Sequence, residues 1–167
     1  MDTVRAVWAS GPEYGFEPGL CLPDVAYITS TGEQRRLSDF KDRKSLLIIL
    51  AGEDSSGLIS SLPAANEEIS RNEGHVIAVL PRLLPEAAAW PFDVVVDAAG
   101  AVRRALSSGL GEPRLTVFVT DRWGEVVFTS KASRGDVAPT VDALLEWLRF
   151  VDQQCPECFP PEWPVTQ

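Results

Sequence analysis

The clearest pattern in the chain is a set of short apolar runs that do not alternate with polar residues. The clearest run occupies residues 45–50, and residues 75–80, 93–96 and 115–120 are further strand candidates, of which 115–120 includes two threonines. A strand with both faces covered has no polar face, so an unbroken apolar run of this length predicts a buried strand. We therefore predict that these runs form the centre of a sheet that helices cover on both faces.

Between these runs, apolar residues recur every three or four positions, which is the spacing of one helix face. The first such helix carries Leu58, Ile59, Leu62, Ala65 and Ile69. Pro63 lies inside it and predicts a kink or a restart, and Gly74 ends it. Short helices are predicted over residues 85–89 and around residues 102–106. A last helix is predicted to start near Asp136 and to run to Val151.

Two hairpins complete the pattern. Residues 25–28 and 34–37 flank a turn, and residues 125–128 return after a second turn at residues 121–124. Ser38 is a candidate cap for one helical turn after the first hairpin. Strands separated by helices imply right-handed parallel crossovers. The predicted fold class is α/β, with a mixed central sheet, helices on both faces and an N-terminal β-hairpin.

The chain of 167 residues has the length of one domain. Glycine and proline are frequent in residues 1–20, which predicts an irregular lead-in. Residues 21–152 then form the domain, and residues 153–167 form a tail rich in cysteine and proline. With 45% hydrophobic and 23% charged residues, the chain has the composition of a globular protein.

The formal net charge of -9 narrows the range of partners. Nucleic acids and anionic membrane surfaces are bound through basic footprints, so we expect neither as a partner. No apolar run is long enough to span a bilayer. The first residues show no pattern of a secretory signal, so a cytoplasmic location is expected.

Four segments then resemble one family, the peroxiredoxins of the alkyl hydroperoxide reductase and thiol-specific antioxidant group. They are Leu-Pro-Asp-Val at residues 22–25, Leu-Ser-Asp-Phe-Lys-Asp at 37–42, Asp-x-x-Gly-x-Val at 97–102, and Phe-x-x-Asp-x-x-Gly-x-Val at 118–126. Their order and spacing also match. The resemblance implies a thioredoxin-like fold and a thiol-based oxidoreductase activity with no cofactor.

The family's catalytic motif does not carry over. Peroxiredoxins place Pro-x-x-x-Thr-x-x-Cys after the central strand, where a helix N-terminus favours the thiolate. Laying that motif on this chain puts Ala51 at the proline, Ser55 at the threonine and Leu58 at the cysteine. A thioredoxin Cys-x-x-Cys would fall on Asp54 and Gly57. The resemblance thus implies a degenerate active-site pocket that lacks the peroxidatic cysteine.

A second landmark of the family is an arginine three residues before the phenylalanine of Phe-x-x-Asp. That position is Leu115 here, and Arg114 lies directly before it. Arg114 is therefore included in the predicted pocket. Glu53 and Asp54 at its mouth are interpreted as helix-capping residues, because Ser55 and Ser56 follow them.

The candidate redox residues are Cys155 and Cys158, which form a Cys-Pro-Glu-Cys motif in the tail. This spacing can close a small disulfide ring or supply two ligands of a zinc site. Their place after a helix C-terminus, with Glu157 between them, favours the thiol over the thiolate. Structural thiols, thiol–disulfide exchange and metal binding all remain open, and no metal site is assigned.

Three further residues are assigned interpretations from the sequence. Cys21 is interpreted as a small buried residue, with the alternative that it resolves a disulfide of the tail. His75 is interpreted as structural, although Cys21 and His75 could complete a zinc set. Asp24 is interpreted as a backbone hydrogen-bond acceptor in the loop that leads into the domain.

Two functions are consistent with these observations. The first is a thiol-based redox or antioxidant protein that acts through Cys155 and Cys158, with a thiol donor or another protein as its partner. The second is a non-catalytic thioredoxin-fold module that binds a partner or forms a homodimer.

Overall fold

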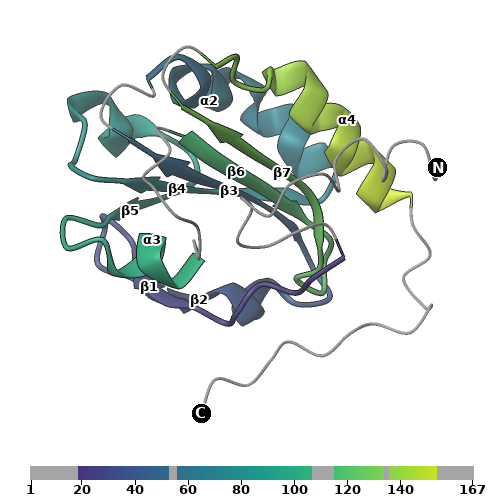
Figure 1. Cartoon of the computed structure of the whole chain (residues 1–167), viewed down its shortest axis with the longest axis horizontal. Coiled ribbons are helices and arrows are strands. Elements are labelled where there is room, and N and C mark those ends of the chain that lie inside the picture. Colours follow the sequence, from purple (N-terminus) through teal and green to yellow (C-terminus); the bar gives the residue numbers. More distant parts are fainter. Residues whose placement is uncertain (1–18, 53–55, 107–114, 134–135, 154–167) are drawn as a thin grey trace.

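The computed structural model describes residues 19–52, 56–106, 115–133 and 136–153. In these residues, five strands form one sheet in the order β5-β4-β3-β6-β7 (Figure 1). The strands are β3 (Ser45–Ala51), β4 (Gly74–Leu80), β5 (Asp93–Val96), β6 (Leu115–Thr120) and β7 (Val126–Ala132). Every residue of β3 is buried, which confirms the prediction that the apolar run at residues 45–50 forms a central strand, and every residue of β6 is buried as well.

The sheet is mixed, as predicted. β3 pairs in parallel with β4, and β4 pairs in parallel with β5. β3 also pairs antiparallel with β6, and β6 pairs antiparallel with β7. The register sets Ala51 opposite Leu115 and Leu115 opposite Ala132. The carboxyl end of β3 therefore lies beside the start of β6 and the end of β7.

Two helices, α2 (Ser56–Arg71) and α4 (Val141–Asp152), cover one face of the sheet (Figure 1). Ile59 and Leu62 of α2 and Leu144 and Leu148 of α4 are buried in one cluster with alternate residues of the strands. The short helix η2 (Pro85–Ala89) adds Ala87 to this cluster. The apolar stripes read from the sequence are the faces that these helices bury.

The opposite face is covered by a two-stranded sheet and two short helices. β1 (Ala26–Ile28) pairs antiparallel with β2 (Gln34–Arg36), and η1 (Leu37–Phe40) and α3 (Ala101–Leu106) complete the layer. Tyr27, Phe40 and Leu106 pack there against Ile48 and Phe118 of the central strands. This layer contains the predicted N-terminal hairpin, and helices lie on both faces of the sheet.

The start of the last helix differs from the prediction. Residues 136–140 are not helical, and α4 begins at Val141. The Thr140 side chain accepts a hydrogen bond of 3.1 Å from the backbone N–H of Ala143, which makes Thr140 the N-cap. The helix therefore starts at this cap, after Pro139.

Other predicted boundaries also shift. α2 continues through Pro63 without a restart and ends at Arg71, and Gly74 belongs to β4. Glu73 takes a left-handed backbone conformation, with a φ of 55°, between them. Ser38 does not cap η1, because Arg36 occupies the N-cap and Asp39 accepts its N–H. In the described part of the chain, no helix has the length and apolar character that crossing a bilayer requires.

Candidate functional site

The carboxyl end of β3 leads to the predicted pocket. Ala51 ends the strand and is buried, and its carbonyl accepts a hydrogen bond from the guanidinium of Arg103 on α3. Arg103 thus brings a positive charge to the end of the central strand. Asp54, Ser55 and Arg114, together with Glu53, lie outside the described residues.

Leu58 occupies the first turn of α2, because that helix begins at Ser56. Its side chain is half-buried and packs against the cluster between the sheet and α4. A leucine here contributes apolar contacts, but it has no nucleophilic or acid–base group. Of the predicted pocket residues, the structure therefore describes Ala51 and Leu58, and both are apolar residues packed against the core.

Sequence reasoning missed Arg103, although its position follows from local structure. Asp97 accepts the backbone N–H of Val102 at 3.2 Å and that of Arg103 at 2.9 Å, and so caps the start of α3. Gly100 just before the helix has a φ of 72°, a conformation that suits glycine. The Asp-x-x-Gly segment sets the direction of α3. An arginine in the first turn of the helix after this segment was the sequence feature that could have pointed to Arg103.

Cys21 lies at the opposite end of β6 and β7. It forms an isolated antiparallel bridge with Glu125, which follows the turn between these strands. Cys21 is half-buried, and burial, followed by the charges of Glu125 and Asp121, raises the pKa of its thiol. Cys21 is therefore remote from the predicted pocket. Cys155 and Cys158 lie outside the described residues.

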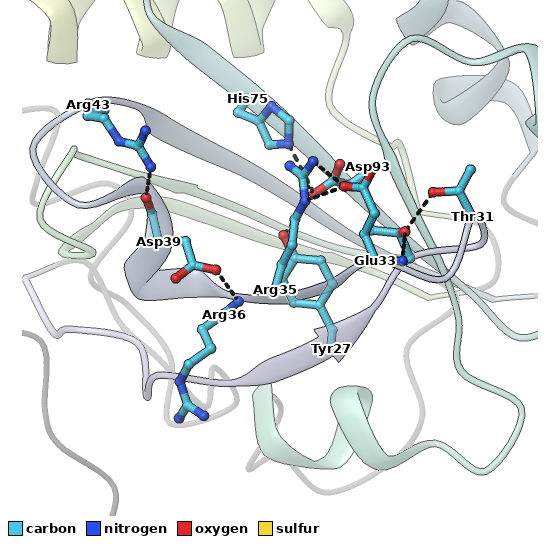
Figure 2. A network of polar contacts seen from close by, with 10 residues as sticks. Tyr27, Thr31, Glu33, Arg35, Arg36, Asp39, Arg43, His75 and Asp93 are labelled. Atoms are coloured by element: carbon cyan, nitrogen blue, oxygen red, sulfur yellow. Dashed lines mark hydrogen bonds and ion pairs between the residues drawn. The ribbon is translucent and has the colours of Figure 1, made fainter.

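A group of polar side chains that the sequence did not reveal surrounds Asp93 on β5. Tyr27 of β1 donates a buried hydrogen bond of 2.8 Å to Asp93 Oδ2, and Nη1 of Arg35 on β2 approaches the same oxygen at 3.4 Å. Nε2 of His75 on β4 lies 3.3 Å from it. Figure 2 shows these three side chains converging on Asp93. Arg35 also pairs with Glu33 at 2.5 Å.

This Asp93 cluster joins the hairpin to the sheet. Burial, the largest influence, raises the pKa of Asp93, but the contacts with His75, Tyr27 and Arg35 outweigh it and hold the pKa below its usual value. The Asp93 side chain is 10% exposed. The ring of His75 also stacks on Phe40, with 4.4 Å between their centroids. These contacts indicate a structural role for His75.

The structure does not place Cys21 and His75 close enough to bind the same zinc ion. His75 is on β4 and Cys21 lies beside β7, so β3 and β6 separate them. Three strand spacings amount to about 14 Å, whereas zinc ligands lie about 2 Å from the metal. Within the residues that the structure describes, no group of three His, Cys, Asp or Glu side chains is placed to hold a metal ion.

Asp24 accepts backbone and side-chain donors, as the sequence suggested. Ser38 donates its N–H to Asp24 Oδ1 at 3.0 Å and its hydroxyl to Oδ2 at 2.8 Å, and Arg36 adds an ion pair of 3.1 Å. Burial acts in the opposite direction, but these donors lower the pKa of Asp24. Asp24 thus fixes the hairpin to η1 and has a structural role.

Comparisons with known proteins identify the architecture. No family model matches the sequence, and no curated protein sequence matches it. Among solved structures, Peroxidoxin BcpB from Mycobacterium tuberculosis has a TM-score of 0.66 and 16% identity, over 81% of this chain and 98% of that one. Peroxiredoxin Q of Xanthomonas campestris has a TM-score of 0.64 and 20% identity, over 84% and 99% of the two chains.

A Chlorobium tepidum protein assigned as a thiol:disulfide interchange protein DsbE is also similar, with a TM-score of 0.60 and 21% identity, over 82% of this chain and 98% of that one. The chain has a thioredoxin-like fold. These identities are low, so the likeness concerns the arrangement of the elements.

Two places on this thioredoxin-like fold could take part in chemistry, and they lie at opposite ends of the sheet. Among the residues that the structure describes, the carboxyl end of β3 and the start of α2 have Arg103 and the apolar Leu58, but no cysteine. The turn between β6 and β7 has Cys21 beside it. The described end of α4 also lies at this turn, because Arg122 is 3.6 Å from Asp152.

Proposed function

We propose that this chain is a thiol-based redox protein whose chemistry depends on Cys155 and Cys158 instead of a cysteine at the start of α2. The proposal rests on the observation that Leu58 occupies the position at the start of α2. There Leu58 packs against the core. The sequence nevertheless keeps a Cys-x-x-Cys pair elsewhere. The likeness to peroxiredoxins and to a thiol:disulfide interchange protein supports a redox role.

The proposed reaction is the reversible oxidation of the tail pair. A bond forms between Sγ of Cys155 and Sγ of Cys158, and the two thiols give up two protons and two electrons. A hydroperoxide accepts them and becomes an alcohol and water, or a partner disulfide accepts them and becomes two thiols. A thiol donor then reverses the step and restores both cysteines.

The proposed pocket at the end of β3 is degenerate. Catalysis there would need a thiolate near the N-terminus of α2, where unpaired N–H groups favour negative charge. Leu58 supplies no such group, and Arg103 donates a hydrogen bond to the carbonyl of Ala51. We therefore expect no peroxide reduction that depends on this pocket.

Peroxide consumption in the presence of a dithiol tests the proposal. The wild type and three variants are compared: Cys155→Ser with Cys158→Ser, Cys21→Ser as the matched thiol control, and Leu58→Ala as the pocket control. We expect the double variant to lose the activity, and the Leu58 variant to keep it while it remains folded. Equal activity of the double variant and the wild type would refute the proposal, and so would an inactive wild type. The latter would favour a binding module.

A further inference from the structure

Two threonines, one on β6 and one on β7, have buried hydroxyls without a hydrogen-bond partner. Thr116 is 1% exposed and Thr129 is 4% exposed. Among the residues that the structure describes, neither Oγ1 atom has a donor or an acceptor within hydrogen-bond distance. Burial of an unpaired hydroxyl is costly, so such a group in a folded protein calls for a polar partner from outside the chain.

The register of the sheet places these two threonines on the same face. Leu115 and Val117 belong to the cluster that α2 and α4 cover, so Thr116 between them points to the opposite face. Thr129 pairs with Phe118, which belongs to the cluster on that opposite face. Residues directly opposed in an antiparallel pair share a face, so both hydroxyls lie on the side of α3 and the hairpin.

Lys131 brings a positive charge to this pair of hydroxyls. It pairs with Thr116 across the two strands and follows Thr129 by two positions on β7. Directly opposed residues have Cβ atoms about 4.5–5.5 Å apart, and residues two positions apart on one strand are about 7 Å apart on the same face. Lys131 is half-buried, so this group of side chains extends from the interior towards solvent.

A second cation lies at the same end of the sheet. Thr116 also pairs with Leu50 of β3, and the carbonyl of the next residue, Ala51, accepts the hydrogen bond from Arg103. Arg103 belongs to α3, which covers the face to which Thr116 points (Figure 1). Two cations therefore lie near the buried hydroxyls, in a chain whose net charge is -9.

We propose that Thr116, Thr129 and Lys131 bind a small oxyanion, the phosphate or carboxylate group of a small molecule. Each threonine hydroxyl donates a hydrogen bond to the anion, and the ammonium group of Lys131 donates a charge-assisted one. Arg103 adds positive charge at the end of β3. This site lies on the face of the sheet opposite Leu58, and the inference does not depend on the redox function proposed for the tail.

Calorimetric titration of the full chain tests the proposal. Inorganic phosphate and sodium acetate are titrated separately, and sodium chloride keeps the ionic strength constant because salt screens charges. The variants are Lys131→Met, Thr116→Val and Thr129→Val. Valine has nearly the shape of threonine but has no hydroxyl, so these variants remove the donor and keep the packing.

The chain offers a matched control for each kind of variant. Thr120 is on the same strand and face as Thr116 and is also buried, but its hydroxyl accepts the N–H of Leu46 at 3.2 Å and donates to the carbonyl of Asp121 at 2.9 Å. Thr120→Val is therefore the control for the threonines. Lys44→Met removes the same charge at the opposite end of β3 and is the control for Lys131→Met.

We expect the wild type to bind one phosphate or acetate ion with a Kd of about 1 mM or lower. Lys131→Met and each of the two threonine variants should raise that Kd about tenfold or more, because each removes a hydrogen bond to a charged group. The two controls should leave it within about twofold. Without anion, Thr116→Val should keep or raise the Tm, whereas Thr120→Val should lower it by leaving the N–H of Leu46 unpaired.

No saturable binding of either anion would overturn the proposal, and so would the same Kd in Lys131→Met and Lys44→Met. A fall in Tm for anion-free Thr116→Val as large as that for Thr120→Val would also overturn it, because the Thr116 hydroxyl would then already have a partner. Binding of one anion alone would support the site and would show whether it takes a phosphate or a carboxylate group.

Discussion

The hydrogen bond from Tyr27 to Asp93 provides the sharpest test of how the hairpin is held on the sheet. Tyr27 is 5% exposed, and its hydroxyl donates to Asp93 Oδ2 at 2.8 Å. Tyr27→Phe removes this donor and leaves the ring in place. Asp93 keeps its contacts with Arg35 and His75, so the variant does not leave a buried carboxylate without a partner.

The expected loss of stability follows from the charge of the acceptor. A hydrogen bond to a charged group contributes about 1.5–3 kcal/mol, roughly twice as much as a neutral one. We therefore expect Tyr27→Phe to lower the free energy of unfolding by about 1.5–3 kcal/mol at pH 7. For a chain of this length, that corresponds to a fall in Tm of about 3–12 °C.

The effect of Tyr27→Phe on the free energy of unfolding should depend on pH both in acid and in alkali. The pKa of Asp93 is lowered, so its contribution is present above the unfolded value of about 3.9 and is lost as pH falls through the folded pKa. Once Asp93 is protonated, the bond from Tyr27 becomes neutral and contributes about 0.5–1.5 kcal/mol. The difference between wild type and variant should therefore shrink in acid.

In alkali the phenol itself titrates. Burial, followed by the charge of Asp93 and the hydrogen bond to it, raises the pKa of Tyr27. A raised pKa gives stability that is present below the unfolded value of about 10 and is lost as pH rises towards the folded value. Phenylalanine has no such ionisation. The wild type should lose about 1.4 kcal/mol per pH unit above 10 relative to the variant.

Urea denaturation under reducing conditions at pH 3, 7 and 10.5 measures these differences. Arg71→Met is the control, because it breaks an exposed ion pair with Glu67 that contributes little. The reasoning predicts the largest difference at pH 7, and less than about 0.5 kcal/mol for the control. A difference for Tyr27→Phe that equals the control at pH 7, or that does not vary with pH, would refute it.

Three further substitutions test other parts of the structure. Gly74→Ala should destabilise the fold by about 1–3 kcal/mol in thermal unfolding, because the new Cβ would lie 2.8 Å from Ile69 Cγ2. Gly57→Ala is the control, because its Cβ meets nothing within 4 Å and the change should be neutral or stabilising. Thr140→Ala should cost about 1 kcal/mol by loss of the cap of α4, and Thr140→Ser should restore most of it. Leu58→Cys and Ala64→Cys are compared in a chain whose native cysteines are replaced by serine. The cysteine at position 58, in the first turn of α2, should react with iodoacetamide at lower pH than the one at position 64 in the middle of the helix. Equal pH profiles would contradict the placement of Leu58 in the first turn.

The fold could be predicted from the sequence because its central strands are apolar on both sides. The runs at residues 45–50 and 75–80 became β3 and β4 with a difference of one residue at one end of each. The periodic stripe of the last helix was also correct. Its start was wrong, because Pro139 was compatible with a first helical turn, while the Thr140 cap depends on local backbone geometry.

The polar network on the hairpin side could not be predicted. Asp93, His75, Tyr27 and Arg35 come from four different strands, and their meeting depends on how the hairpin lies against β4 and β5. Nothing in the spacing along the chain indicates that arrangement. Arg103 was missed for a similar reason, since its contact with Ala51 joins residues far apart in sequence.

Quantitative mass spectrometry of the thiols, before and after one equivalent of hydrogen peroxide and again after a dithiol, tests the central claim most directly. The account predicts that residues 150–167 lose two hydrogen atoms per chain through Cys155 and Cys158 and regain them with the dithiol. The Leu58→Ala variant should behave in the same way. Both tail cysteines remaining reduced while the chain consumes peroxide would contradict the claim.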